Sequence, residues 1–98
     1  MTIENQTVRL HATVEGRVQG VGFRYFVIQN AEELNLMGWV RNLDSGDVEV
    51  TAEGNKGVLD KLLEALRRGP GSGYVANVRV DWQEASGEYK RFRIIPDC

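Results

Sequence analysis

A glycine-rich stretch that ends in an arginine is the part of this sequence best suited to bind an anion. It reads Gly16-Arg17-Val18-Gln19-Gly20-Val21-Gly22-Phe23-Arg24 and joins an expected strand to an expected helix. Backbone amides at such a junction have no helical partners, and the helix dipole favours negative charge there. Glycines keep side chains away from these amides. Because a guanidinium binds two phosphate oxygens at once, Arg24 would complete a pocket for a tetrahedral dianion.

The spacing of these glycines leaves two interpretations open. It matches neither the dinucleotide-binding fingerprint, Gly-x-Gly-x-x-Gly, nor the Walker motif, which requires Gly-Lys-Ser/Thr. On the local pattern alone, a glycine-rich turn with Arg24 as a solvated helix residue explains the stretch equally well.

Asn42 is the second residue whose type could serve chemistry. It ends the segment Gly38-Trp39-Val40-Arg41-Asn42, directly before an expected turn. An asparagine in this place is most often a turn former, and the pattern alone favours that explanation. The functional interpretation is that its neutral amide holds a water molecule beside a bound phosphate, where a carboxylate would repel a dianion.

The residue pattern in the first half of the chain predicts the strands and the helix that position these residues. Strict alternation of apolar and polar residues over Val8 to Glu15 predicts a half-buried strand, and apolar residues at helical spacing from Phe23 to Leu34 predict a helix of three turns. A second strand is expected over Met37 to Leu43. Asp44-Ser45-Gly46 predicts a turn into a third strand, on which Val48, Val50 and Ala52 alternate, so the two strands form a hairpin.

The second half predicts a helix and two strands. Asn55 is the expected N-cap of the helix and Gly69-Pro70 its end. A fourth strand follows, with Ala76, Val78, Val80 and Trp82 on one face, and Phe92 with Ile94 marks a short last strand. This order predicts an α+β fold, a ferredoxin-like α/β sandwich of the βαββαβ type. Its mostly antiparallel sheet carries two helices on one face. Residues 1–7 are expected to be a flexible polar leader and residues 8–98 one domain.

Charge and composition exclude several kinds of partner. Twelve Lys and Arg against 14 Asp and Glu give a net charge of -2, which argues against a nucleic-acid binder. The single cysteine, Cys98, permits no intramolecular disulfide and no cysteine metal site, so a reducing compartment fits. No apolar run is long enough to span a membrane. We expect a cytoplasmic monomer that needs no cofactor or metal and binds neither nucleic acid nor membrane.

The two candidate segments together resemble the signatures of a known family. Val14 to Arg24 resembles the first signature of the acylphosphatases, and Gly38 to Asn42, followed by Gly46, Val48 and Gly54, resembles the second. Both are present without gaps, and the resemblance covers residues 8 to 95. It implies a small, monomeric, metal-independent enzyme of ferredoxin-like fold that converts a small acyl phosphate and water into a carboxylate and inorganic phosphate.

The resemblance also implies roles for individual residues. Arg24 would bind the phosphate of the substrate, and Asn42 would orient the attacking water. The loop amides would complete the phosphate site, and they belong to Val18, Gln19, Gly20, Val21, Gly22 and Phe23. Three alternatives stay open: an RNA-binding domain of the same fold, an accessory domain that handles carbamoyl phosphate inside a larger maturation protein, and a phosphate-binding domain without turnover.

Overall fold

The computed structural model of the chain describes residues 6–98, which form seven elements. In chain order these are β1 (Thr7–Arg17), α1 (Phe23–Glu33), β2 (Met37–Asn42), β3 (Val48–Asn55), α2 (Lys56–Arg68), β4 (Tyr74–Glu84) and β5 (Phe92–Ile94). Their order and approximate limits agree with those expected from the hydrophobic spacing. Of the predicted leader, residues 1–5 lie outside the described residues, and Thr7 already belongs to β1.

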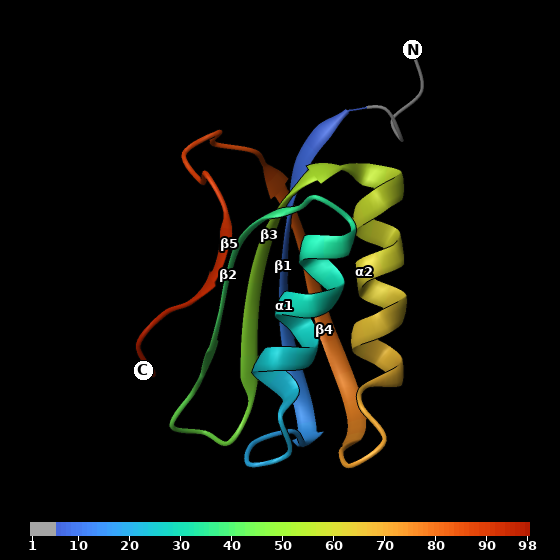
Figure 1. Cartoon of the computed structure of the whole chain (residues 1–98), viewed down its shortest axis with the longest axis vertical. Helices are drawn as coiled ribbons and strands as arrows, with labels where there is room; N and C mark the ends of the chain where they lie inside the picture. The colour runs from blue at the N-terminus through green and yellow to red at the C-terminus, as the bar shows by residue number, and fades with distance from the viewer. Residues whose placement is uncertain (1–5) are drawn as a thin grey trace.

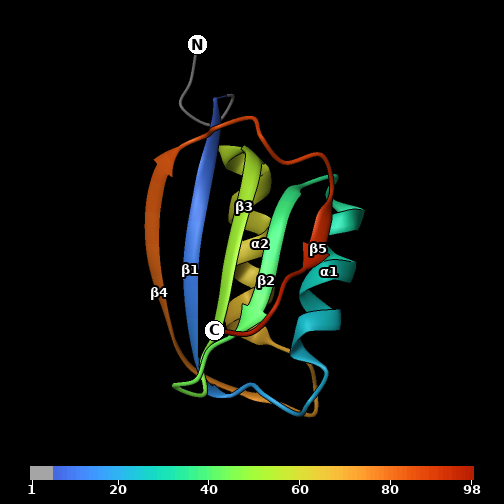
Figure 2. The same cartoon turned by 90° about the vertical axis from the view of Figure 1, so that its left-hand side faces the viewer.

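The five strands form one sheet in the order β4-β1-β3-β2-β5. β1 pairs antiparallel with β3 and β4, and β2 pairs antiparallel with β3, while the short β5 runs parallel to β2. Both helices lie on the same face of this sheet (Figures 1 and 2). The prediction of a ferredoxin-like sandwich with a mostly antiparallel sheet is therefore confirmed.

The core lies between the two helices and the sheet. Alternation on the strands directs every second residue toward the helices, and the helices contribute residues at spacings of three and four. The buried core residues include Leu10, Ala12 and Val14 of β1, Val48, Val50 and Ala52 of β3, Phe23, Val27 and Ala31 of α1, and Leu59, Leu62 and Leu66 of α2. As predicted, Asn55 caps α2, because its side chain accepts a 2.9 Å hydrogen bond from the amide of Gly57.

The fourth strand departs from the predicted alternation at one residue. The register of β1 and β4 shifts between Glu15 and Gly16, which pair with Asn77 and Val75 respectively. Ala76 is therefore the extra residue of a β-bulge. It is exposed, and Val75 packs against the core in its place. The expectation that Ala76 shares a face with Val78 was wrong, because a simple two-residue period does not anticipate a bulge.

The strand register brings the two candidate segments to one edge of the sheet. β1 and β2 both run antiparallel to β3, which lies between them, so β1 and β2 end at the same edge. Val14 of β1 and Asn42 of β2 both pair with Val48 of β3. The two residues are thus level, two strand spacings or about 10 Å apart. The loop after β1 and the end of β2 consequently face one another.

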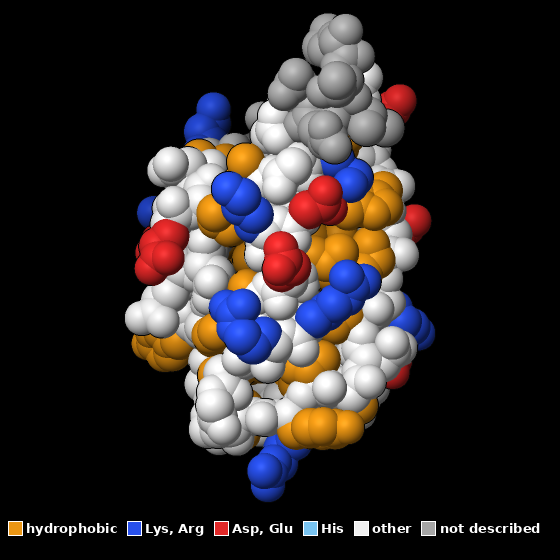
Figure 3. All heavy atoms as spheres, turned by 90° about the vertical axis from the view of Figure 1, so that its right-hand side faces the viewer, with side chains coloured by type: hydrophobic (Ala, Val, Ile, Leu, Met, Phe, Trp, Pro, Cys, Tyr) orange, Lys and Arg blue, Asp and Glu red, His pale blue; other side chains and the backbone are white. Residues whose placement is uncertain are grey.

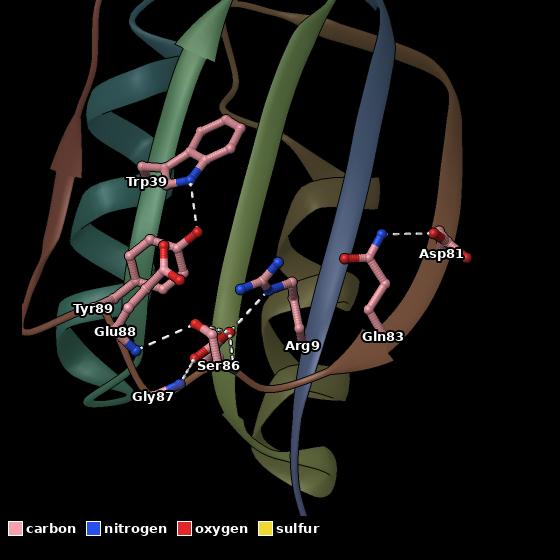
Figure 4. A network of polar contacts seen from close by, with 9 residues as sticks. Arg9, Trp39, Asp81, Gln83, Ser86, Gly87, Glu88 and Tyr89 are labelled. Carbon is pink, nitrogen blue, oxygen red and sulfur yellow. Dashed lines mark hydrogen bonds and ion pairs between the residues drawn. The ribbon is translucent and has the colours of Figure 1, made fainter.

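The sheet face opposite the helices carries a buried carboxylate. Glu53 is only 5% exposed, and the segment between β4 and β5 contacts it through Ser86 and Gly87, which Figure 4 shows near Arg9. Its oxygens accept hydrogen bonds from the amides of Ser86 (2.8 Å) and Gly87 (3.0 Å) and from Arg9 Nε (2.8 Å). Burial raises the pKa of Glu53, but these hydrogen bonds lower it more, so the net pKa lies below its ordinary value.

This carboxylate should make the fold sensitive to acid. A lowered pKa in the folded chain adds stability that is present above the ordinary pKa, about 4.3, and is lost as the pH falls through the folded value. We expect the free energy of unfolding to fall below about pH 5. In Glu53→Gln it should be lower by about 1–3 kcal/mol at pH 7 and depend less on pH. Urea unfolding at several pH values measures both effects, and Glu64→Gln, an exposed position on α2, is the control. An unchanged pH profile in Glu53→Gln would contradict this account.

Candidate active site

The loop between β1 and α1 holds its amides open toward solvent. Gly20 (φ 75°) and Gly22 (φ 76°) both adopt the left-handed conformation that glycine tolerates best. Gly22 is also the N-cap of α1, so no side chain caps this helix end, and no acidic residue lies in its first turn. Within residues 6–98, the amides of residues 19 to 25 donate no hydrogen bond. Several donors at the positive end of a helix thus remain available to an anion.

The side chain of Gln19 fixes the loop against the neighbouring hairpin. Its Nε2 donates to the carbonyl oxygens of Leu43 (2.8 Å) and Asp47 (2.9 Å). On the other side of the loop, Ser72 Oγ donates to the carbonyl of Val21 (2.9 Å). The loop is therefore tied at two points to segments distant in sequence. This rigidity matters because a site of preorganised amides loses its advantage when the amides are mobile.

A small cavity of about 90 Å³ lies between this loop and the end of β2. We call it the Arg24 cavity. It is lined by Val18, Gly20, Gly22, Phe23, Arg24, Tyr25, Asn42 and Ile94. Of the six residues whose amides are expected to bind phosphate, four line the cavity, whereas Gln19 and Val21 do not. Arg24, whose side chain is 39% exposed, is the only charged residue that residues 6–98 contribute to the lining. The structure thus brings Arg24 and Asn42 together at one cavity.

Asn42 has an unusual environment for an asparagine at a strand end. It shares the helix-facing side of β2 with Val40, which is completely buried, so its side chain continues the row of core residues. Its Oδ1 is buried and accepts no hydrogen bond from any residue within 6–98. A buried polar atom without a partner costs about 1–3 kcal/mol. Such a cost is typical of functional sites, where the missing partner is a ligand or a water.

A carboxylate of the chain itself already contacts both candidate residues. Asp97 Oδ1 lies 3.4 Å from Nη1 of Arg24 and accepts a 3.3 Å hydrogen bond from the backbone amide of Asn42. One anionic oxygen can therefore sit between the guanidinium and the end of β2. Asp97 was not predicted, because nothing was inferred from the segment Ile95 to Cys98. An acidic residue in a short polar segment gives no signal of its position in space.

Two apolar residues at the mouth of the Arg24 cavity were also missed. Tyr25 is 71% exposed and Ile94 is 37% exposed, and both line the cavity. The signal for Tyr25 was available, because it follows Arg24 on a helix whose buried positions are Phe23, Val27 and Ala31. The cavity thus has a polar end for an anion and an apolar rim beside it.

Other hollows on the surface of residues 6–98 do not bring the predicted site residues together. A larger hollow of about 210 Å³ lies along β2 and the segment before β5, and none of the predicted site residues lines it. The side of the molecule seen in Figure 3 mixes acidic and basic side chains without a continuous field of one sign. Within residues 6–98, no group of three or more His, Cys, Asp and Glu is placed to hold a metal ion. In the same part of the chain, neither helix has the length and apolarity needed to cross a membrane.

Comparisons with known proteins agree with the two motifs. The family model of the acylphosphatases matches residues 10–94. An acylphosphatase of Acaryochloris marina is 46% identical over 86 residues, which cover 88% of this chain and 91% of that protein. The crystal structure of the acylphosphatase from Bacillus subtilis superimposes with a TM-score of 0.87 at 40% identity, over 90% of this chain and 98% of that one. Full-length HypF in a phosphate- and nucleotide-bound form also matches, at 31% identity and a TM-score of 0.85, over 94% of this chain but 12% of HypF.

Proposed function

Because the chain belongs to the acylphosphatase family, we propose that it hydrolyses small acyl phosphates to a carboxylate and inorganic phosphate. The observation that carries this proposal is the Arg24 cavity, where free loop amides and one guanidinium meet an unpartnered amide oxygen of Asn42.

The phosphoryl group of the substrate would occupy the polar end of the cavity. Its oxygens are negatively charged, and the amides at the start of α1 together with Arg24 are the donors that face them. Asp97 Oδ1 supports this placement, since it shows that an anionic oxygen fits between Arg24 and the backbone amide of Asn42. The acyl group would then extend toward the apolar rim formed by Tyr25 and Ile94.

Asn42 would hold the attacking water. Its buried Oδ1 can accept a hydrogen bond from a water molecule, which turns a lone pair of the water oxygen toward phosphorus. Attack forms a new phosphorus–oxygen bond as the bond to the acyl oxygen breaks, and the carboxylate leaves with the electron pair. A carboxylate is a stable leaving group and needs no acid to protonate it. We assign the second water proton to a phosphoryl oxygen of the substrate, which yields dihydrogen phosphate. The family resemblance and the proposed chemistry require no metal ion.

A single assay tests the activity. The purified chain is incubated with benzoyl phosphate in the presence of EDTA, and the loss of substrate and the release of phosphate are followed together. We expect equimolar loss and release, with no hydrolysis of p-nitrophenyl phosphate, whose phenolate is a poorer leaving group. Binding of phosphate without turnover would leave only a phosphate-binding domain and refute the proposal. Turnover that stops in EDTA would refute its metal independence.

A second candidate function is favoured by the likeness to HypF. In that protein the matching segment makes up a small part of a much longer chain, so a module of this fold can work inside a larger protein. In that case the chain would handle carbamoyl phosphate for a neighbouring domain. Parallel assays distinguish the two, because a free acylphosphatase should turn over benzoyl phosphate at least as well as carbamoyl phosphate.

We further propose that the protein acts as a cytoplasmic monomer without a nucleic-acid partner. RNA-binding domains of related architecture stack bases on aromatic residues of their central strands. Here the central strands β1 and β3 contain no aromatic residue. Sedimentation at several concentrations tests the monomer, and RNA binding that weakens steeply with salt would contradict the second statement.

A further inference from the structure

We propose that Asp97 competes with phosphate for Arg24 and so weakens the binding of both the substrate and the phosphate product. The inference rests on the anion site of the proposed function and adds a residue that sets the affinity of that site. Its basis is the position of the Asp97 carboxylate, which contacts Arg24 and the backbone amide of Asn42 through the same oxygen.

The backbone around Asp97 is held in place beside β2. The amide of Ile95 donates to the carbonyl of Val40 (3.0 Å), and the amide of Cys98 donates to the carbonyl of Asn42 (3.1 Å). The amide of Asp44 donates in turn to the carbonyl of Cys98 (2.6 Å). The segment from Ile95 to Cys98 therefore continues along β2 beyond the end of β5, as Figure 2 shows near the C-terminus. The Asp97 side chain is kept beside the Arg24 cavity.

The contact between Asp97 and Arg24 is weak enough to be displaced. It consists of one 3.4 Å approach, and the two side chains are 54% and 39% exposed. Exposed ion pairs of this kind contribute little to the stability of a fold. Tethering nevertheless gives the carboxylate a high effective concentration at the guanidinium. It can thus oppose an external anion although the contact itself is weak.

Charge makes the Asp97 carboxylate and a bound phosphate oppose each other at Arg24. Arg24 is the only charged residue that lines the cavity, and a phosphate dianion placed beside the Asp97 carboxylate would be repelled by it. A bound phosphate must therefore displace the Asp97 side chain or bind against its charge. Either way the free energy of phosphate binding becomes less favourable, and the product is released more easily.

The test measures the dissociation constant of inorganic phosphate by calorimetry or by NMR titration, without any turnover. In Asp97→Asn, which keeps the shape of the side chain, we expect the dissociation constant to fall about three- to tenfold at low salt. The difference should shrink as salt rises, because the charges involved are exposed. The matched control is Asp44→Asn, an exposed carboxylate in the neighbouring turn that forms no ion pair with any residue of 6–98. It should change the constant less than twofold.

The outcomes separate this inference from the proposed function. An unchanged dissociation constant in Asp97→Asn would overturn the inference, and so would weaker binding, which would make Asp97 a positioning residue for Arg24. An equal gain in Asp44→Asn would also overturn it, because the effect would then be one of general charge. Tighter phosphate binding in a chain that hydrolyses no acyl phosphate would uphold the competition and refute the proposed function alone.

Discussion

Replacing Arg24 by alanine should lower kcat/KM for benzoyl phosphate by about 1000-fold or more while the protein stays folded. Removing one preorganised donor to a developing negative charge typically costs 100- to 1000-fold, and here the lost donor carries the only charge in the lining of the cavity. Arg24→Lys should lose nearly as much, because an ammonium cannot bind two phosphate oxygens in the geometry of a guanidinium. The measurements are steady-state kinetics and the dissociation constant of phosphate.

Measurements of the free energy of unfolding distinguish a loss of activity in Arg24→Ala from a loss of folded protein. The recorded polar contact of the Arg24 side chain is the exposed one with Asp97, so its loss should change the free energy of unfolding by less than about 0.5 kcal/mol. Arg68→Ala, at an exposed position in the last turn of α2, is the matched control and should retain full activity. A variant Arg24→Ala with more than a tenth of the normal kcat/KM would refute the assigned role.

Replacing Asn42 by alanine should separate turnover from binding. The variant loses the oxygen that we propose holds the water, so kcat should fall about 100- to 1000-fold. The backbone amide of Asn42, Arg24 and the loop amides remain, so the dissociation constant of phosphate should change less than about threefold. The unfolding free energy should stay equal or rise by up to about 1 kcal/mol, because a buried oxygen without a partner is removed. Near-normal turnover would show that Asn42 does not place the water.

Two further variants make this prediction specific. Asn42→Asp puts a carboxylate where a dianion must bind, so it should weaken phosphate binding as well as turnover. Asn77→Ala, an exposed position on β4, is the control for loss of an asparagine amide and should leave both unchanged. If Asn42→Ala lost stability in parallel with activity, the residue would be structural.

The fold was predictable because the local sequence of each helix and strand indicates its type. The alternation of apolar and polar residues from Val8, and the helical spacing of apolar residues from Phe23, indicate which face each element buries. Because two of the strands form a hairpin, only a few arrangements of the helices can cover the apolar face of the sheet. The bulge at Ala76 was not predictable in this way. It depends on the pairing of β4 with Gly16 of β1, which the local sequence of β4 does not contain.

The residues of the candidate site that belong to the two sequence motifs were predictable. The glycine-rich segment and the end of the second strand identify Arg24 and Asn42 as candidates, and both residues line one cavity in the structure. The contacts that hold the loop and surround these two residues could not be predicted from the sequence. Gln19 anchors the loop by donating to backbone carbonyls of the β2–β3 hairpin. Every residue has a backbone carbonyl, so the side chains of the hairpin give no signal of this contact. Asp97 reaches the site only because the chain continues beside β2, a contact between residues 55 positions apart in sequence.

The shared pairing of Val14 and Asn42 with Val48 makes the geometry of the candidate site depend on three strands at once. Because β1 and β2 do not touch, a slip of one residue in only one of the two pairings would move Val14 and Asn42 out of level. It would also turn the side chains of the slipped strand to the opposite face of the sheet. Partly folded chains that hold only one of these pairings therefore contain no working site. Under the proposed function, activity would report on the completed sheet, and selection for activity would also select for correct alignment of the central strand.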